Sequence, residues 1–187
     1  RASAARGLSP HRGPATAPPP HGWMNGPDNC LVVGRWLYCV AKDNSRLVRY
    51  DLSALAADPE AGPPRGEVVL EDVIPIEGLG LQRFSGHSAL AAGDGWLYLA
   101  FRTSSELIRV RLAEDGRLAQ PLLAQLIARF DPFDPKSMKS ANLTDITLDP
   151  QGRLYVLSAK PTRVYRFTPD PKQVFDILDR YILSKVA

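Results

Sequence analysis

The sequence lacks acidic side chains near its beginning, and this absence explains its net charge. No Asp or Glu precedes Asp28. Arg1, Arg6 and Arg12 therefore account for the formal net charge of +3, because residues 28–187 hold 20 basic and 20 acidic side chains. Binding to nucleic acid depends on clustered Lys and Arg that neutralise phosphates, and the sequence has no such cluster. We therefore exclude nucleic acid as a partner.

Long apolar runs are also missing. Runs such as Leu97–Phe101 are only a few residues long, whereas a transmembrane helix needs about 20. The 187 residues are 44% hydrophobic and 23% charged, which is typical of a globular chain with a buried core. The sequence thus predicts neither a membrane span nor a chain that is disordered throughout.

The first 22 residues have a different composition from the rest. Residues 1–22 are rich in Ala, Pro, Gly and Arg and have no apolar periodicity, which predicts a disordered leader. Two interpretations remain open, a Pro-rich linker and the remnant of a transit peptide.

An internal repeat is the most informative feature of the sequence. Three segments align, GRWLYCVAKDNSRLVRYDLS from Gly34, DGWLYLAFRTSSELIRVRLA from Asp94 and QGRLYVLSAKPTRVYRFTPD from Gln151. In each segment a Tyr precedes an Arg by 11 residues, and the segments recur at offsets of 60 and 57 residues. The pairs are Tyr38 and Arg49, Tyr98 and Arg109, and Tyr155 and Arg166.

Each repeat divides into short strands separated by turn residues. An apolar strand leads through a Gly-containing turn to a strand built on Leu-Tyr, and a third strand alternates apolar and charged residues. A fourth strand is expected at 67–73 and again near 122–130. Four antiparallel strands in each repeat of this length are typical of a β-propeller blade.

The expected domains follow from this repeat. Residues 23–170 are expected to form three blades, at about 23–80, 81–138 and 139–170. Residues 171–187 have apolar residues at helical spacing after Asp170 and Pro171, which predicts a C-terminal amphipathic helix or a last strand.

The run ANLTDITLDPQGRLYVLSAKPTRVYRFTPD, residues 141–170, resembles the blade signature of NHL-repeat and SMP-30/gluconolactonase-like propellers. The resemblance is weaker in residues 85–115 and weakest in 25–52. It implies an all-β fold with β-propeller blades of four antiparallel strands, three of an expected six. Because this class contains lactone hydrolases, other enzymes and binding platforms, the resemblance does not specify an activity.

Three blades cannot close a ring, since propellers have about 4–8 blades. An open arc would expose sheet edges. We therefore expect either a longer chain or an oligomer.

The only two cysteines, Cys30 and Cys39, face each other if Gly34 and Arg35 form a two-residue hairpin turn. Such a non-hydrogen-bonded pair brings Cα atoms to about 4.5 Å, within the range of a disulfide. A disulfide would indicate export to the periplasm or the cell exterior. The alternative is that both cysteines are small apolar residues of a buried strand pair.

Candidate site residues lie in loops where the first strand of each blade begins and where the second strand meets the third. Asn29, His87, Arg102 and Asn142 are the candidate binding residues. His87 could act as a general base near neutral pH, with a structural histidine as the alternative. Asp145 is the candidate carboxylate base of a hydrolase.

The resemblance implies a metal role for Asn142. This residue occupies the place of a Pro-Asn-Gly whose Asn coordinates a divalent cation, such as calcium, although Ala141 and Leu143 replace Pro and Gly. The alternative is that Asn142 caps a loop through its own backbone.

Three functions are consistent with these patterns. The first is a propeller module that binds a small polar ligand or a protein partner on its loop face. The second is a metal-dependent lactonase or esterase-like hydrolase of the SMP-30 type. The third is a structural subunit that completes a larger propeller.

Overall fold

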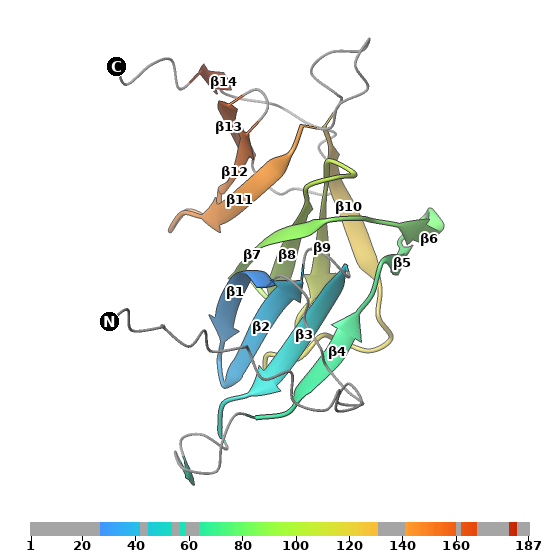
Figure 1. Ribbon diagram of the computed structural model, residues 1–187, viewed down its shortest axis with the longest axis vertical. Helices are drawn as coiled ribbons and strands as arrows, with labels where there is room; N and C mark the ends of the chain where they lie inside the picture. The colour runs from blue at the N-terminus through green and yellow to red at the C-terminus, as the bar shows by residue number, and fades with distance from the viewer. Residues whose placement is uncertain are drawn as a thin grey trace, which may run out of the picture.

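The protein is built from β-strands that form three sheets (Figure 1). The computed structural model describes residues 27–41, 45–53, 57–58, 64–130, 141–159, 162–167 and 180–182. The expected leader at 1–22 lies outside these residues. Figure 1 shows the second sheet between the other two.

The first sheet has four antiparallel strands in the order β1-β2-β3-β4. Their bounds are Pro27–Val33, Trp36–Ala41, Arg46–Asp51 and Gly66–Leu70. Chain order and spatial order agree, which is the up-and-down arrangement of a propeller blade.

The second sheet contains the same arrangement and two further strands, in the order β6-β5-β10-β9-β8-β7. The blade strands β7 to β10 are His87–Gly93, Trp96–Phe101, Glu106–Arg111 and Ala124–Arg129. The additional hairpin consists of β5, Val73–Ile76, and β6, Gly80–Arg83, and β5 pairs in parallel with β10. The repeat did not predict this hairpin, which precedes the second blade.

The third sheet has the order β11-β12-β13-β14. Its strands are Leu143–Leu148, Leu154–Ala159, Thr162–Phe167 and Arg180–Ile182. Of the two expectations for residues 171–187, a helix and a last strand, the helix is wrong for residues 180–182, because their backbone pairs with β13 as the fourth strand. Residues 168–179 and 183–187 lie outside the described part of the chain. Among the described residues, no helix has the length and apolar character needed to cross a membrane.

The equal Tyr-to-Arg spacing of the repeats sets the same strand register in every sheet. Each Tyr lies directly opposite its Arg on the neighbouring strand, and these three pairs are Tyr38 and Arg49, Tyr98 and Arg109, and Tyr155 and Arg166. We call the sheet surface that bears this Tyr the forward face and the opposite surface the rear face. The three forward faces are therefore equivalent, position by position.

The hydrophobic core lies between successive sheets. Tyr38 and Leu47 on the first forward face share a buried cluster with Leu99 on the second rear face. In the same way, Tyr98 and Leu107 on the second forward face share a cluster with the third rear face, which contributes Leu154, Val156 and Tyr165. Each forward face thus packs on the next rear face, as successive propeller blades do.

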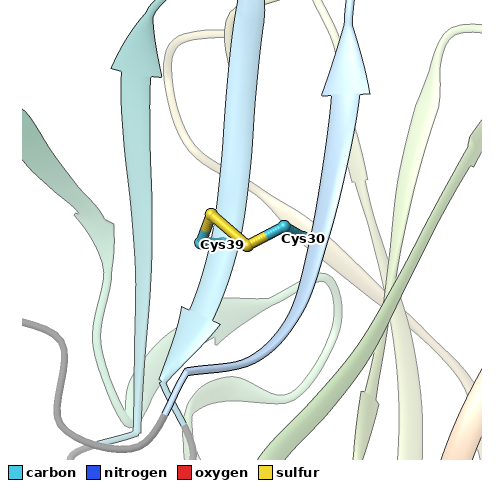
Figure 2. The surroundings of a disulfide bond; sticks show 2 residues. All are labelled: Cys30 and Cys39. Carbon is cyan, nitrogen blue, oxygen red and sulfur yellow. A yellow bond between two sulfur atoms is a disulfide. The ribbon is translucent and has the colours of Figure 1, made fainter. Parts of the chain in front are cut away.

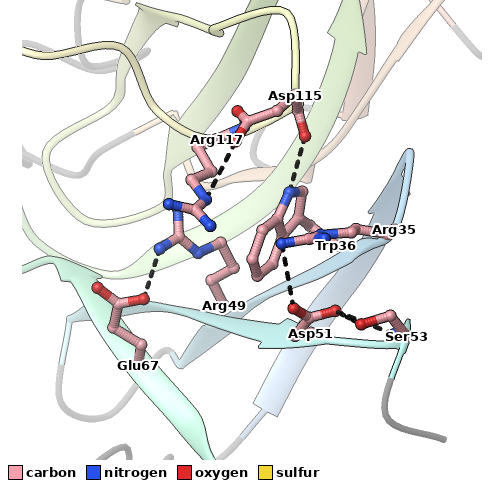
Figure 3. A network of polar contacts seen from close by, with 8 residues as sticks. All are labelled: Arg35, Trp36, Arg49, Asp51, Ser53, Glu67, Asp115 and Arg117. Atoms are coloured by element: carbon pink, nitrogen blue, oxygen red, sulfur yellow. Dashed lines mark hydrogen bonds and ion pairs between the residues drawn. The ribbon is translucent and has the colours of Figure 1, made fainter. Parts of the chain in front are cut away.

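Trp36 forms the centre of a polar junction between the first two sheets (Figure 3). Its Nε1–H donates to the carbonyl oxygen of Asp115 at 2.8 Å, and the Tyr38 hydroxyl donates to that of Gly116 at 2.7 Å. The guanidinium groups of Arg49 and Arg117 lie 4.6 and 4.9 Å from the Trp36 ring centre. The loop between β9 and β10 is therefore held on the forward face of the first sheet.

Cys30 and Cys39 lie opposite each other on β1 and β2 and form a disulfide (Figure 2). Val33 pairs with Trp36, so Gly34 and Arg35 form the two-residue turn that the sequence predicted. The two Cα atoms are 4.2 Å apart, as expected for a non-hydrogen-bonded pair. The disulfide links the two strands on the rear face of the first sheet.

Candidate functional site

The first strand of every blade has a bulge near its beginning. The strand register shifts between Pro27 and Asn29 in β1, and the bulges of β7 and β11 lie between His87 and Ala89 and between Leu143 and Asp145. A bulge adds a residue to one strand and redirects its side chain, and bulges are frequent beside functional sites. The extra residues are Asp28, Ser88 and Thr144.

Two of these extra residues bond within their own sheet. The Ser88 hydroxyl donates to the carbonyl oxygen of Ala100 at 3.1 Å. The Thr144 hydroxyl donates to the carbonyl oxygen of Leu157 at 3.3 Å. Ala100 and Leu157 occupy the same position of the repeat, so the two contacts are equivalent.

The first blade differs because its extra residue is an acid. An ionised carboxylate has no proton to donate to a carbonyl oxygen, so Asp28 cannot make the contact seen in the other two blades. Its Oδ2 lies instead 3.3 Å from Nη2 of Arg102, which follows β8 in the second blade. The bulge thus directs a carboxylate across the junction between two blades.

Arg102 is held at this position by its backbone. Its N–H donates to the carbonyl oxygen of Gly86 at 2.6 Å. Gly86 has a φ of +69°, and a Cβ there would lie 2.6 Å from Oγ1 of Thr103, so the close approach of the two segments requires glycine. The side chains of Asp28 and Arg102 are 28% and 27% exposed, so solvent or a ligand can reach both.

Further polar groups lie along the same end of the sheets, which we call the loop face. Asn29 is half-buried and pairs with Val40. The Ser104 hydroxyl is buried and has no hydrogen-bond partner among the described residues. The loop face therefore combines a carboxylate, a guanidinium group, an amide and a hydroxyl over the first two blades.

Asn142 begins the third blade in a left-handed conformation, with a φ of 52°. Asn adopts this conformation more readily than most residues. Its carbonyl oxygen accepts a hydrogen bond from the N–H of Ala159 at 3.1 Å. Within the described part of the chain, no three His, Cys, Asp or Glu side chains are placed to share a metal ion.

His87 lies in the core rather than on the loop face. Its side chain is fully buried, and its ring packs edge-on against Phe101 at a centroid distance of 4.6 Å. Neither ring nitrogen has a hydrogen-bond partner among the described residues. Burial lowers the pKa of His87 to about 4, with a small opposing effect of Asp72, so the ring is neutral at pH 7.

Asp145 is exposed on the forward face of the third sheet. Its Oδ1 accepts a hydrogen bond from the N–H of Ile146 at 2.9 Å. No hydrogen bond or ion pair in the described ranges connects Asp145 with His87 or Asn142. Of the candidate site residues, the structure thus links Arg102 with Asp28, which was not among the candidates.

A groove of about 640 Å³ lies at the opposite end of the first two sheets. It is lined by the turns at Gly34 and Gly95 and by the loop that contains Glu114 and Asp115, together with Arg111. Sequence reasoning missed this groove, because glycine turns at strand ends are expected in any blade.

The similarity of this chain to known proteins is limited. No family model matches the sequence, and no curated protein matches it. Among solved structures the chain is similar to a glutaminyl cyclase from Myxococcus xanthus, at 14% identity over 74% of this chain and 53% of that chain, with a TM-score of 0.43.

Two further similar structures are a quinoprotein alcohol dehydrogenase-like protein from Bacteroides thetaiotaomicron and a virginiamycin B lyase from Staphylococcus aureus. The first is 17% identical over 84% of this chain and 34% of that chain, with a TM-score of 0.47. The second is 11% identical over 78% of this chain and 54% of that chain, with a TM-score of 0.40. All three are β-propeller-like proteins, and the chain spans about half or less of their length.

Proposed function

We propose that this chain is a β-propeller module of the NHL-repeat and SMP-30-like class that binds a small polar ligand on its loop face, at Asp28 and Arg102. The observation that supports this proposal is the redirected carboxylate of the first blade. Ser88 and Thr144 use the equivalent bulges to bond within their own sheets, whereas Asp28 reaches the guanidinium group of the next blade.

The chemistry of the pair defines the ligand class. A guanidinium group binds a carboxylate through two parallel hydrogen bonds, and a carboxylate accepts hydrogen bonds from hydroxyl groups. Both side chains are about one-quarter exposed, so a ligand can reach them without unfolding the loop face. We therefore expect a small molecule that carries a carboxylate and several hydroxyl groups.

Gluconate and sorbitol test this proposal as a matched pair, because both carry hydroxyl groups but only gluconate carries a carboxylate. In calorimetric titrations of the intact chain, gluconate should bind and sorbitol should bind at least about tenfold more weakly. Arg102→Gln should abolish this preference. Arg83→Gln is the matched control, because Arg83, the last residue of β6, forms an ion pair with Asp72 rather than with Asp28.

Equal heats for gluconate and sorbitol, or unchanged gluconate binding by Arg102→Gln, would contradict the proposal. A protein partner that binds the chain and is lost only in Arg102→Gln would place a macromolecule at this face instead. The hydrolase alternative remains a prediction. It requires calcium at Asn142, and turnover of a lactone that persists in excess chelator would exclude it.

A further inference from the structure

The groove at the turns of Gly34 and Gly95 contains a charge arrangement that differs between the first two blades. In the first blade, Asp51 lies directly opposite Trp36 on the neighbouring strand, and its Oδ2 lies 3.4 Å from Nη2 of Arg35 (Figure 3). The guanidinium group of Arg35 lies 4.5 Å from the Trp36 ring centre. The first blade thus has a guanidinium group that stacks on a tryptophan and is paired with a carboxylate.

The second blade carries its guanidinium group on the neighbouring strand instead of in the turn. Arg111 occupies the position of Asp51, because it lies directly opposite Trp96, and Gly95 occupies the position of Arg35. The Arg111 guanidinium group lies 5.0 Å from the Trp96 ring centre. Because glycine has no side chain, the turn supplies no carboxylate, and no ion pair connects Arg111 with an acid among the described residues. The stacked guanidinium group of this blade therefore lacks the carboxylate that its equivalent has.

The position beside Arg111 is open as well as uncharged. A Cβ at Gly95 would lie 3.9 Å from Cζ of Arg111, which is an ordinary van der Waals contact, so a further group fits there without displacing the guanidinium group. A Cβ at Gly34 would have no heavy atom within 4 Å. The groove over these turns has a volume of about 640 Å³, which is typical of a small-molecule site.

The loop between β9 and β10 forms another part of the groove wall, and hydrogen bonds fix its conformation. The Leu112 N–H donates to the carbonyl oxygen of Gly95 at 2.8 Å, and the Gly116 N–H donates to that of Ala113 at 2.9 Å. Trp36 holds the same loop on the first sheet. The groove is therefore formed before a ligand arrives, which lowers the entropic cost of binding.

This loop also supplies an acid that has no partner in the described part of the chain. Asp115 is already paired, because its Oδ2 lies 3.2 Å from Nε of Arg117. Glu114 is exposed, lines the groove and forms no ion pair with another described residue. Val32 lines the same groove and is 59% exposed. The groove thus combines an unpaired cation, an unpaired anion and an apolar surface.

We propose that this groove binds a small zwitterion with an apolar body, of the class of apolar dipeptides. The carboxylate of the ligand supplies the counter-charge of Arg111, as Asp51 does for Arg35, through two parallel hydrogen bonds. Glu114 accepts charge-assisted hydrogen bonds from the ammonium group, and the apolar side chains contact Val32. The inference does not rest on ligand binding at the loop face, because the groove lies at the opposite end of the sheets.

Calorimetric titration of the intact chain with leucyl-leucine and two analogues tests this inference. Leucyl-leucinamide lacks the carboxylate, and N-acetyl-leucyl-leucine lacks the ammonium group. The dipeptide should bind the wild type, and each analogue should bind at least about tenfold more weakly.

Two variants assign these preferences to their side chains. Arg111→Gln should weaken dipeptide binding at least about tenfold and remove the difference between the dipeptide and its amide. Glu114→Gln should remove only the difference between the dipeptide and its N-acetyl form. Arg83→Gln is the matched control, because Arg83 is exposed and paired with Asp72, and it should leave the affinity for the dipeptide unchanged.

A second pair of variants tests the missing carboxylate directly. Gly95→Asp and Gly95→Asn add side chains of similar size at a φ of +76°, so both have the same backbone strain, but only Gly95→Asp places a carboxylate beside Arg111. Gly95→Asp should therefore bind the dipeptide at least about tenfold more weakly than Gly95→Asn. Equal affinities of these two variants would contradict the inference.

A wild-type chain that does not bind the dipeptide, or that binds the dipeptide and its amide equally, would overturn the inference. Dipeptide binding that Arg111→Gln leaves unchanged would do so as well, because the ligand would then bind elsewhere. Arg111 is exposed, so Arg111→Gln keeps the inference falsifiable even if the variants of the Gly95 turn do not fold.

Discussion

Protonation of His87 should control the acid stability of this protein. The pKa of this group falls from 6.5 to about 4 on folding because burial disfavours the charged imidazolium. Between these two pH values the unfolded chain binds the proton more strongly than the folded chain, so the free energy of unfolding falls as the pH falls. The contribution of His87 to stability is complete above pH 6.5 and is lost progressively towards pH 4.

The size of the effect follows from the shift. Each pKa unit corresponds to 1.36 kcal/mol, so the shift costs about 3 kcal/mol between pH 6.5 and pH 4. This is a large share of the roughly 5–15 kcal/mol that stabilises a typical domain. Protonation places an unpaired charge beside Phe101, in the core between the first two sheets.

The matched variant is His87→Leu, which has similar volume and cannot titrate. Because neither ring nitrogen has a hydrogen-bond partner among the described residues, this substitution should cost little at pH 7. Denaturant unfolding followed by tryptophan fluorescence at pH 7, 6, 5 and 4 gives the stability of both proteins. The titrating carboxylates are the same in both proteins, so the difference between the two free energies of unfolding reports the contribution of His87 alone.

The stability difference between His87→Leu and the wild type should move by about 3 kcal/mol in favour of the variant from pH 7 to pH 4. A difference that does not change with pH would refute the reasoning. It would show that the folded protein accommodates the imidazolium, either through solvent or through an acceptor.

Three further predictions concern the junctions and turns. Tyr38→Phe should lower the free energy of unfolding by about 1–2 kcal/mol, because the Gly116 carbonyl loses its hydrogen-bond donor. Tyr50→Phe serves as the control, and equal urea midpoints for Tyr38→Phe and the wild type would contradict this prediction. Asn142→Ala should be less stable than Asn142→Gly by about 1 kcal/mol in thermal melts, because alanine is strained at a φ of 52°. An alanine variant more stable than the glycine variant would show that the side chain at this position matters more than the backbone conformation. The intact mass should be two hydrogens lower than that of the reduced chain, and alkylation before reduction would show that Cys30 and Cys39 are free.

The constant spacing between Tyr and Arg in the three repeats made the strand register predictable. In an antiparallel hairpin the turn length determines which residues face each other, so a constant Tyr-to-Arg spacing requires the same cross-strand pair in each sheet. The two-residue turn at Gly34 predicted the position of Cys39 opposite Cys30 for the same reason. The three-sheet arrangement could therefore be predicted from the repeat alone.

The bulges could not be predicted, and the site depends on them. Regular alternation would place His87 on the same face as Ala89, among the small residues of the second forward face. The bulge instead pairs His87 with Phe101, on the rear face, where it is buried. The same shift directs Asp28 to Arg102, and no residue pattern indicates which of two neighbouring residues is the extra one.

The C-terminal segment shows the limit of periodicity. Apolar residues at helical spacing left two structures open for residues 171–187, a helix and a last strand, and residues 180–182 complete the third sheet as a strand. An open edge on β13 offers unpaired backbone groups, and pairing them outweighs a weak local preference for helix.

The most direct test of the central claim is the side-chain Nε–Hε resonance of Arg102 in a nitrogen-15 spectrum during a gluconate titration, assigned with Arg102→Gln. The account predicts a saturable shift of this resonance that sorbitol does not produce, and no comparable shift of the Arg83 resonance. An Arg102 resonance that stays in place, or one that moves together with all other arginines, would contradict a ligand site at the first bulge.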